Sequence, residues 1–255
     1  MKVQILGCSG GIASGRRTTS LLVNDHILID GGTGLGDLAQ AQISDIRHLF
    51  LSHSHLDHIA GLPFLLDPLL RDPGATGVTL YAQPETLDAL QRHVFNGVLW
   101  PDLAALPDGG APVLRYHAMQ PGQCCTVEGV DIRMIGVNHT VPTAGFHLQA
   151  GSASVGFSGD TTTNTALWQA LNEAESLDLL VVEAAFPDEE EALSRASKHY
   201  CPGSLASDIK QLRHRPLTVL SHAKPGFEDV ILQQCRAAMP DRDVRALSAG
   251  DCFTL

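Results

Sequence analysis

The chain alternates short apolar runs, rich in Val, Ile and Leu, with polar turns. Runs of this length and composition predict β-strands, because a strand needs only a few residues to bury its side chains. The predicted strands are Val3–Leu6, Ser20–Val23, Ile27–Asp30, His48–Ser52, Val78–Tyr81, Asp131–Val137, Ser154–Ser158, Leu179–Glu183 and Thr218–Ser221.

Longer amphipathic stretches predict helices, each beginning near Pro, Gly, Asn or an acidic residue, as helix starts often do. They are Pro84–Phe95, Ala166–Asn172, Gly203–Leu212 and Glu228–Ala238. Clusters of Pro, Gly and Asp predict loops at Arg71–Gly77 and Pro101–Pro112. Strands come first in a meander and then alternate with helices. This order predicts an α/β fold in which helices flank a sandwich of two mixed sheets.

Length and composition narrow the class of protein. The 255 residues, 44% of them hydrophobic, suffice for one large core, and no composition shift marks a border. We therefore expect a single domain over residues 1–255. The net charge of −11, from 17 basic and 28 acidic residues, is the opposite of the balance in proteins that grip nucleic acid non-specifically. A large nucleic acid is not the expected partner.

The same composition bears on location. No apolar run approaches the roughly 18 residues of a transmembrane helix, so we expect no membrane partner. The six cysteines form no CxxC pair, and we expect reduced thiols. The N-terminal residues lack the basic segment and apolar run of a secretion signal. These features indicate a cytoplasmic protein.

The sharpest chemical signal is an HxHxDH motif at residues 53–58, directly after an apolar run. Imidazole and carboxylate groups suit zinc and neighbouring divalent metals. At a strand end, His53 and His55 project to the same side, because side chains along a strand alternate with a period of two. Leu56 is expected to point into the core. Asp57 and His58 begin the next turn and face a second metal position.

Three later apolar runs each end in one candidate ligand, namely His139, Asp160 and His222. Ligands in open sheets lie beyond the carboxyl ends of the strands, so these residues are expected to converge with the motif on a binuclear centre. A carboxylate has two oxygens and can bridge two cations. The predicted ligands are His53, His55 and His139 for one metal and Asp57, His58 and His222 for the other, with Asp160 shared.

The order and spacing of these residues resemble the metallo-β-lactamase superfamily over nearly the whole chain. That resemblance implies a four-layered αβ/βα sandwich with the metals at one edge, between the two sheets. Four segments are more specifically similar to class II cyclic-nucleotide phosphodiesterases. They are Leu6–Gly11 followed by Arg17–Ser20, His53–Pro63, Val182–Phe186 and Lys198–Pro202.

The last two of these segments imply a catalytic pair. The resemblance gives His199 the role of donating a proton to the leaving alkoxide, oriented or kept protonated by Glu183. Asp57 would orient the nucleophile as well as bind metal. The alternative is that Glu183 caps a loop and His199 lies on the surface. The chain departs from the family at Tyr200 and Cys201, where Leu-Thr is expected.

The expected function is therefore that of a binuclear-metal hydrolase, a phosphodiesterase acting on a small nucleotide such as 3′,5′-cyclic AMP or GMP. The expected cofactors are two divalent ions, zinc first, with manganese or iron as alternatives. Other readings are a tRNA 3′-processing endonuclease, a hydrolase of lactones, thioesters or β-lactams on the same metals, and a non-enzymatic scaffold. Analogy with the superfamily adds the expectation of a homodimer. At the turn before the helix at 166–172, Asn164 is expected to be an N-cap rather than a phosphate contact.

Overall fold

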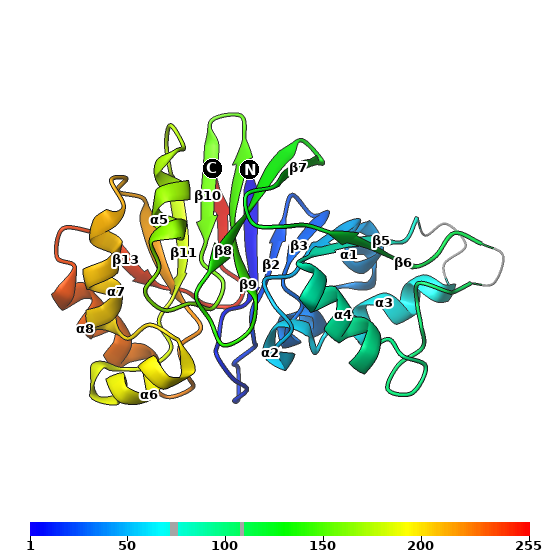
Figure 1. Cartoon of the computed structure of the whole chain (residues 1–255), viewed down its shortest axis with the longest axis horizontal. Helices are drawn as coiled ribbons and strands as arrows, with labels where there is room; N and C mark the ends of the chain where they lie inside the picture. The colour runs from blue at the N-terminus through cyan, green and yellow to red at the C-terminus, as the bar shows by residue number, and fades with distance from the viewer. Residues whose placement is uncertain (72–75, 108–109) are drawn as a thin grey trace.

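The computed structural model describes residues 1–71, 76–107 and 110–255, and within them fourteen strands form two sheets of seven (Figure 1). The strands are β1 (Lys2–Gly7), β2 (Ser20–Val23), β3 (Ile27–Ile29), β4 (His48–Phe50), β5 (Val78–Ala82), β6 (Leu114–Ala118), β7 (Cys124–Val127), β8 (Val130–Val137), β9 (Thr143–Ala150), β10 (Ala153–Phe157), β11 (Leu179–Glu183), β12 (Leu217–Ser221), β13 (Val244–Ala246) and β14 (Cys252–Thr254).

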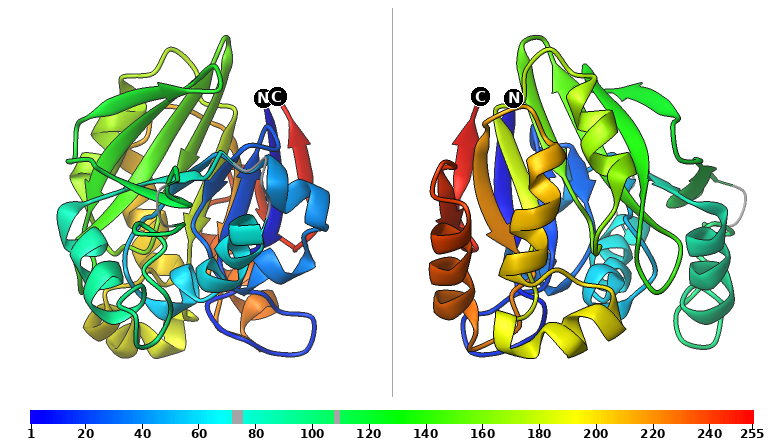
Figure 2. Two further views of the ribbon diagram at one scale, coloured as in Figure 1. Left: turned by 90° about the vertical axis from the view of Figure 1, so that its right-hand side faces the viewer. Right: turned by 60° about the vertical axis from the view of Figure 1, so that its left-hand side comes forward.

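Helices pack on the outer faces of both sheets, and one of them, over residues 191–197, lies along the lower edge of the molecule (Figures 1 and 2). They are α1 (Gln40–Asp45), α2 (Leu56–Ile59), α3 (Leu62–Leu66), α4 (Pro84–His93), α5 (Thr165–Asn172), α6 (Glu191–Ser197), α7 (Pro202–Asp208) and α8 (Glu228–Ala238). Short 3₁₀ turns cover Thr33–Asp37, Asp67–Arg71, Asp188–Glu190 and Ile209–Gln211. No helix in the described ranges is both long and apolar enough to span a bilayer.

The two sheets are built on the same plan. The first has the order β14-β1-β2-β3-β4-β5-β6, antiparallel as far as β3 and parallel from β3 to β6. The second has the order β13-β12-β11-β10-β9-β8-β7, antiparallel from β7 to β10 and parallel from β10 to β13. The expected meander followed by βα alternation is therefore found once in each sheet, rather than once along the chain.

Three apolar clusters hold four layers together. The inner faces of both sheets meet in one cluster, where Phe50 from the first sheet contacts Phe146 from the second edge to face at 5.9 Å between ring centroids. The outer face of the first sheet packs against α3 and α4, and that of the second against α5, α7 and α8. This confirms the predicted four-layered sandwich of two mixed sheets flanked by helices.

All nine predicted strands are present, with ends that differ by at most two residues. The sequence missed β6, β7 and β9, whose runs include polar or glycine positions, and the three-residue strands β13 and β14. The four predicted helices correspond to α4, α5, α7 and α8, although α7 ends at Asp208 and a 3₁₀ turn follows. Residues 72–75 of the predicted loop Arg71–Gly77 lie outside the described residues, and so do residues 108–109 of the predicted loop Pro101–Pro112. All six cysteines are free thiols, as expected.

A glycine at the end of β1 allows the first hairpin to close. The strand β1 shifts register against β2 at Gly7, and a Cβ atom built there would lie 2.0 Å from the Thr18 carbonyl oxygen. The next residue, Cys8, accepts a hydrogen bond from the backbone N–H of His222 at 2.6 Å. Gly7 thus permits close packing within the first sheet, and Cys8 beside it bonds to the segment that carries His222.

We expect Gly7→Ala to destabilise the fold by about 3 kcal/mol, at the upper end of the usual cost of overpacking, because the clash is with backbone that cannot rotate away. Gly36→Ala is the matched control, since a Cβ there meets nothing within 4 Å, and it should change stability by less than about 0.5 kcal/mol. Denaturant unfolding measures both. Equal stability of the two variants would contradict this account of Gly7.

Candidate metal centre

Residues far apart in the sequence meet at one edge of the sandwich, where several strands end. The HxHxDH segment follows β4 and runs into α2, with His55 as the residue preceding that helix. His139 follows β8, Asp160 follows β10 and His222 directly follows β12. The structure therefore brings all seven predicted ligands together, each at the end of a strand or at the start of a helix.

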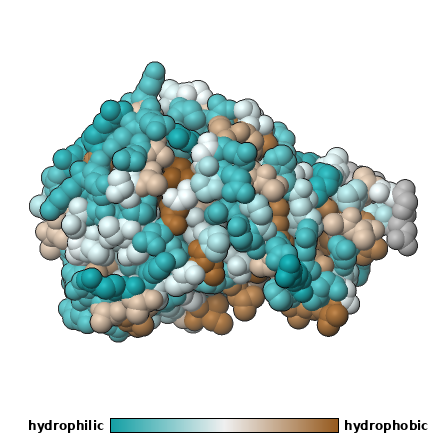
Figure 3. Space-filling model, in the orientation of Figure 1, coloured by the Kyte–Doolittle hydropathy of each residue, from teal (hydrophilic) through white to brown (hydrophobic). Residues whose placement is uncertain are grey.

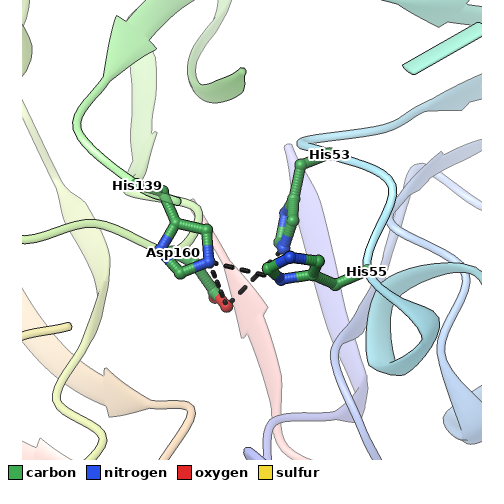
Figure 4. A group of neighbouring side chains, drawn as sticks. All are labelled: His53, His55, His139 and Asp160. Carbon is green, nitrogen blue, oxygen red and sulfur yellow. Dashed lines mark hydrogen bonds and ion pairs between the residues drawn. The ribbon is translucent and has the colours of Figure 1, made fainter. Parts of the chain in front are cut away.

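The first group consists of His53, His55, His139 and Asp160, whose candidate ligand atoms all lie within 4.8 Å of one another. Figure 4 shows His53 and His55 approaching from one side, and His139 and Asp160 from the other. The His139 Nε2 atom lies 3.3 Å from His55 Nδ1 and 4.0 Å from Asp160 Oδ2. These atoms converge on one small volume.

The second group consists of Asp57, His58, Asp160 and His222, again within 4.8 Å of one another. His222 Nε2 lies 3.2 Å from Asp57 Oδ2 and 3.1 Å from Asp160 Oδ2. His58 Nε2 lies 3.3 Å from the other oxygen of Asp160. The division into two groups, with Asp160 in both, is the one expected from the sequence.

A buried carboxylate behind the cluster orients two of its imidazoles. Asp30 is fully buried and lies 2.7 Å from His58 Nδ1 through Oδ2. The same oxygen accepts from the Ser52 hydroxyl at 2.7 Å, and Ser52 Oγ lies 2.9 Å from His53 Nδ1. Both imidazoles therefore carry their proton on Nδ1 and turn Nε2 toward the cluster, the arrangement by which outer partners fix metal-binding histidines.

His139 is held in the same way by backbone. Its Nδ1 lies 3.1 Å from the Lys198 carbonyl oxygen, and Lys198 Nζ donates to the His139 carbonyl oxygen at 2.9 Å. Nδ1–H must be the donor to a carbonyl, so Nε2 faces His55 and Asp160. Lys198 has a left-handed backbone conformation, with φ at +56°, and this ends α6 at the required point.

Unpaired polar atoms test whether the cluster suits a cation. Within the described chain, His53 Nε2 is completely buried and makes no hydrogen bond. An unsatisfied buried nitrogen is costly, and a lone pair directed at carboxylate oxygens gains nothing from them. Nitrogen and oxygen donors at this spacing are those that zinc and similar divalent ions prefer. The residues fit a pair of divalent ions that share Asp160.

The acid–base properties of the cluster differ between its two groups. Burial lowers the pKa of His53 well below its usual value and that of His139 to about 4. Burial also opposes protonation of His222, but the Asp160 carboxylate outweighs it and raises the pKa of His222 to about 9. Burial likewise opposes ionisation of Asp160, yet His222 and His58 hold its pKa well below the usual range. His53 and His139 in the first group are thus neutral imidazoles, while His222 in the second group holds a proton beside Asp160.

A further buried pair lies against this cluster. His199 Nδ1 lies 2.9 Å from Glu183 Oε1, and both residues are buried, with 7% and 2% of their surface exposed. The imidazole of His199 stacks on that of His222 with 5.0 Å between centroids and an interplanar angle of 21°. The alternative that placed His199 on the surface is therefore wrong.

Two other expectations have clear outcomes. Asn164 is an N-cap, since its Oδ1 accepts from the Leu167 backbone N–H at 2.9 Å at the start of α5. The expectation that Leu56 points into the core is wrong, because 71% of Leu56 is exposed. Figure 3 shows hydrophobic residues along the lower edge of the molecule, where α2 lies in Figure 1. Leu56 is the first residue of α2, and His58 and Ile59 are the buried ones.

Sequence reasoning missed the role of Asp30 and Ser52. Asp30 ends an apolar run, the same signal that singled out Asp160, and it was predicted only as the last residue of a strand. Its backbone is left-handed, with φ at +59°, which is uncommon outside glycine and is frequent at functional sites. A run that ends in Asp-Gly-Gly could have drawn attention to it.

Comparison with known proteins gives the same picture at the level of the family. Residues 25–223 match the family described as "Beta-lactamase superfamily domain". A Yersinia pestis protein named "Probable 3′,5′-cyclic-nucleotide phosphodiesterase" is 24% identical over 278 aligned positions, which cover 89% of this chain and 79% of that protein. The Ribonuclease Z of Bradyrhizobium diazoefficiens is 25% identical over 305 aligned positions, covering 94% and 96%.

Solved structures support the fold. Unliganded yeast PDE1 superimposes with a TM-score of 0.84 at 20% identity, covering 100% of this chain and 99% of that one. YhfI from Bacillus subtilis, described as a metallo-β-lactamase fold protein, gives a TM-score of 0.80 at 20% identity, covering 99% of each chain. With the family match over residues 25–223 and hydrolases among its relatives, the chain belongs to the β-lactamase superfamily and has the metallo-β-lactamase fold.

Proposed function

We propose that this protein is a binuclear-metal phosphodiesterase that hydrolyses a small nucleotide such as 3′,5′-cyclic AMP or GMP. The observation that carries the proposal is the buried His199–Glu183 pair, with its 2.9 Å contact, stacked on a histidine of the metal cluster. An alkoxide is a poor leaving group and must be protonated as the phosphodiester breaks, and a positioned imidazole is the usual donor. The pair supplies that donor next to the candidate metals.

In this proposal His53, His55 and His139 would hold one ion and Asp57, His58 and His222 the other, with Asp160 available to both. Zinc is the first candidate for both positions, with manganese and iron as alternatives. A pair of bound divalent ions would lower the pKa of water to about 7 and offset negative charge on the phosphate.

The chain's own groups supply orientation and the proton. Asp57 is partly exposed, with 28% of its side chain accessible, so it can contact both an ion and the attacking nucleophile. The Nδ1–H of His199 donates to Glu183, which leaves Nε2 to carry the proton for the leaving oxygen. His199 also lines an open pocket with hydroxyl groups around it, including those of Thr162, Thr163 and Ser204. This pocket gives the leaving group room beside its proton donor.

The relatives support a phosphodiester substrate in two forms, since one is named as a cyclic-nucleotide phosphodiesterase and the other as Ribonuclease Z. A net charge of −11 favours the small substrate over a transfer RNA. A parallel assay decides between them, with cyclic AMP, cyclic GMP, an aryl phosphodiester, a lactone and a precursor tRNA. Turnover of the lactone alone, or of the precursor tRNA in preference to both cyclic nucleotides, would overturn the proposal.

The variant Asp160→Asn should lose most of its bound metal and all measurable turnover. An amide presents only one oxygen and no charge, so it cannot hold two cations together. Metal analysis by mass spectrometry and a phosphodiester assay measure the two effects. Asp88→Asn, on the exposed face of α4, is the matched control and should keep both. Normal metal content and turnover in Asp160→Asn would remove the bridging assignment.

The variant His199→Ala should keep both metals and lose turnover selectively. Esters with poor leaving groups need the proton, and we expect them to slow by about 100-fold or more, within the range of general acid catalysis. Esters with good leaving groups should slow far less. The comparison uses aryl phosphodiesters of graded leaving-group pKa, with His93→Ala on the surface of α4 as the control. An equal loss on all esters would show that His199 is not the donor.

Metal binding should depend on pH in two stages. In the metal-free protein His222, with a pKa of about 9, is protonated at neutral pH and must lose that proton to bind a cation. His139, with a pKa of about 4, is already neutral. As the pH falls below about 9, protons should compete with the ion of the second group and weaken its binding progressively, while protonation of His139 should oppose binding in the first group only as the pH nears about 4. Metal content after equilibrium dialysis at graded pH tests this, and loss of both ions over one range would contradict it.

A further inference from the structure

A second buried carboxylate lies behind the His199–Glu183 pair. Asp208, at the end of α7, is 4% exposed, and one of its oxygens accepts three hydrogen bonds. The donors are the Trp168 indole N–H at 2.8 Å, the Asn164 backbone N–H at 3.0 Å and the Tyr200 hydroxyl. Its other oxygen accepts from Gln211 at 2.7 Å. A buried charge with this many donors is well satisfied and holds its partners in fixed positions.

One branch of this hydrogen-bond network runs from Asp208 through Tyr200 to Glu183. The Tyr200 side chain is completely buried, and its backbone N–H donates to Glu183 Oε2 at 3.3 Å. The Tyr200 carbonyl oxygen in turn accepts from the Ala185 backbone N–H at 3.0 Å. His199 immediately precedes Tyr200, so these bonds hold the backbone next to the imidazole.

The other branch runs from Asp208 through Asn164 to Glu183. The Asn164 side-chain amide donates to Thr161 Oγ1 at 2.9 Å, and the Thr161 backbone N–H donates to Glu183 Oε1 at 2.9 Å. Both branches begin at the Asp208 carboxylate and end at the Glu183 carboxylate. Together they form a closed ring of hydrogen-bonded residues that contains both buried carboxylates. Each oxygen of Glu183 receives one backbone N–H from this ring, and His199 adds its Nδ1–H to Oε1.

We propose that Tyr200 and Asp208 are positioning residues that align His199 for proton donation, acting through the Glu183 carboxylate. This inference rests on the proposed function of His199. The Tyr200 hydroxyl bears on the reaction only by anchoring its own backbone, and Asp208 contacts neither the metal cluster nor the pocket beside His199.

The hydrogen bond to Asp208 gives a physical reason for the departure from the family pattern at Tyr200. Tyr200 stands where class II phosphodiesterases are expected to have Leu, which can fill the same apolar space but cannot bond to a carboxylate. The hydroxyl and Asp208 therefore work as one unit in this chain. Without the tyrosine donor the Asp208 oxygen keeps two of its three bonds, so the fold should survive while the anchor of the His199 segment loosens.

The test is Tyr200→Phe, assayed with aryl phosphodiesters of graded leaving-group pKa. We expect kcat for poor leaving groups to fall about tenfold, a part of the roughly 100- to 10,000-fold that a general acid contributes, with little change for good leaving groups. Metal content and KM should stay at the wild-type values. Asp208→Asn keeps an acceptor oxygen for the same donors and should show a milder change in the same direction.

Tyr116→Phe is the matched control, because Tyr116 lies in β6 of the other sheet and its buried hydroxyl makes no hydrogen bond within the described chain. It should leave the leaving-group dependence unchanged. A Tyr200→Phe protein that is unaffected, or that slows equally on all esters while His199→Ala remains selective, overturns the positioning role and leaves the proposed function standing. If His199→Ala itself slows all esters equally, the donor role of His199 fails instead.

Discussion

The site depends first on the convergence of imidazoles on the buried Asp160 carboxylate. His58 and His222 approach it to 3.3 Å and 3.1 Å, and His53 and His139 lie within 4.0 Å. Burial alone would raise the pKa of such a carboxyl, but His222 and His58 lower it. The charge of Asp160 therefore persists in a place from which water is largely excluded. That charge, with the unpaired Nε2 of His53 facing it, is the reason a pair of cations suits this edge of the fold.

The two sheets bring these groups together by a shared geometry. In each sheet a set of antiparallel strands leads into parallel strands, and the carboxyl ends of β4, β10 and β12 lie at the same edge. His222, with φ at +64°, turns the chain sharply at the end of β12. Its backbone N–H bonds to Cys8 across the sandwich, so both sheets fix the position of its imidazole. Packing of the sheets thus sets the spacing between the ligand groups.

The sequence predicted which residues meet at this edge better than it predicted the residues that support them. Each ligand follows a recognisable apolar run, and the functional signal is local: a polar residue placed directly where a strand ends. Asp30 carries that signal too, but its partners Ser52 and His58 lie more than twenty positions away, and only the parallel pairing of β3 with β4 brings them together. The prediction for Leu56 was wrong because a local pattern was extended too far along the chain. Alternation along a strand would have buried it, but the chain has already turned into α2, where a period of 3.6 applies.

The buried carboxylates that orient the site's histidines lie on both of its sides, one beside each sheet. Asp30 orients His53 and His58 on the first sheet, and Asp208 holds the ring of hydrogen bonds behind His199 on the second. Asp160 joins the two sides of the site, because its neighbour Thr161 donates to Glu183 while its own oxygens face the candidate metal-binding histidines. A metal cluster alone would serve ester hydrolysis of many kinds on this fold. The hydrogen-bond ring around Asp208 would adapt this chain to an alkoxide leaving group. A proton donor is effective only where its imidazole is held at the correct angle and distance.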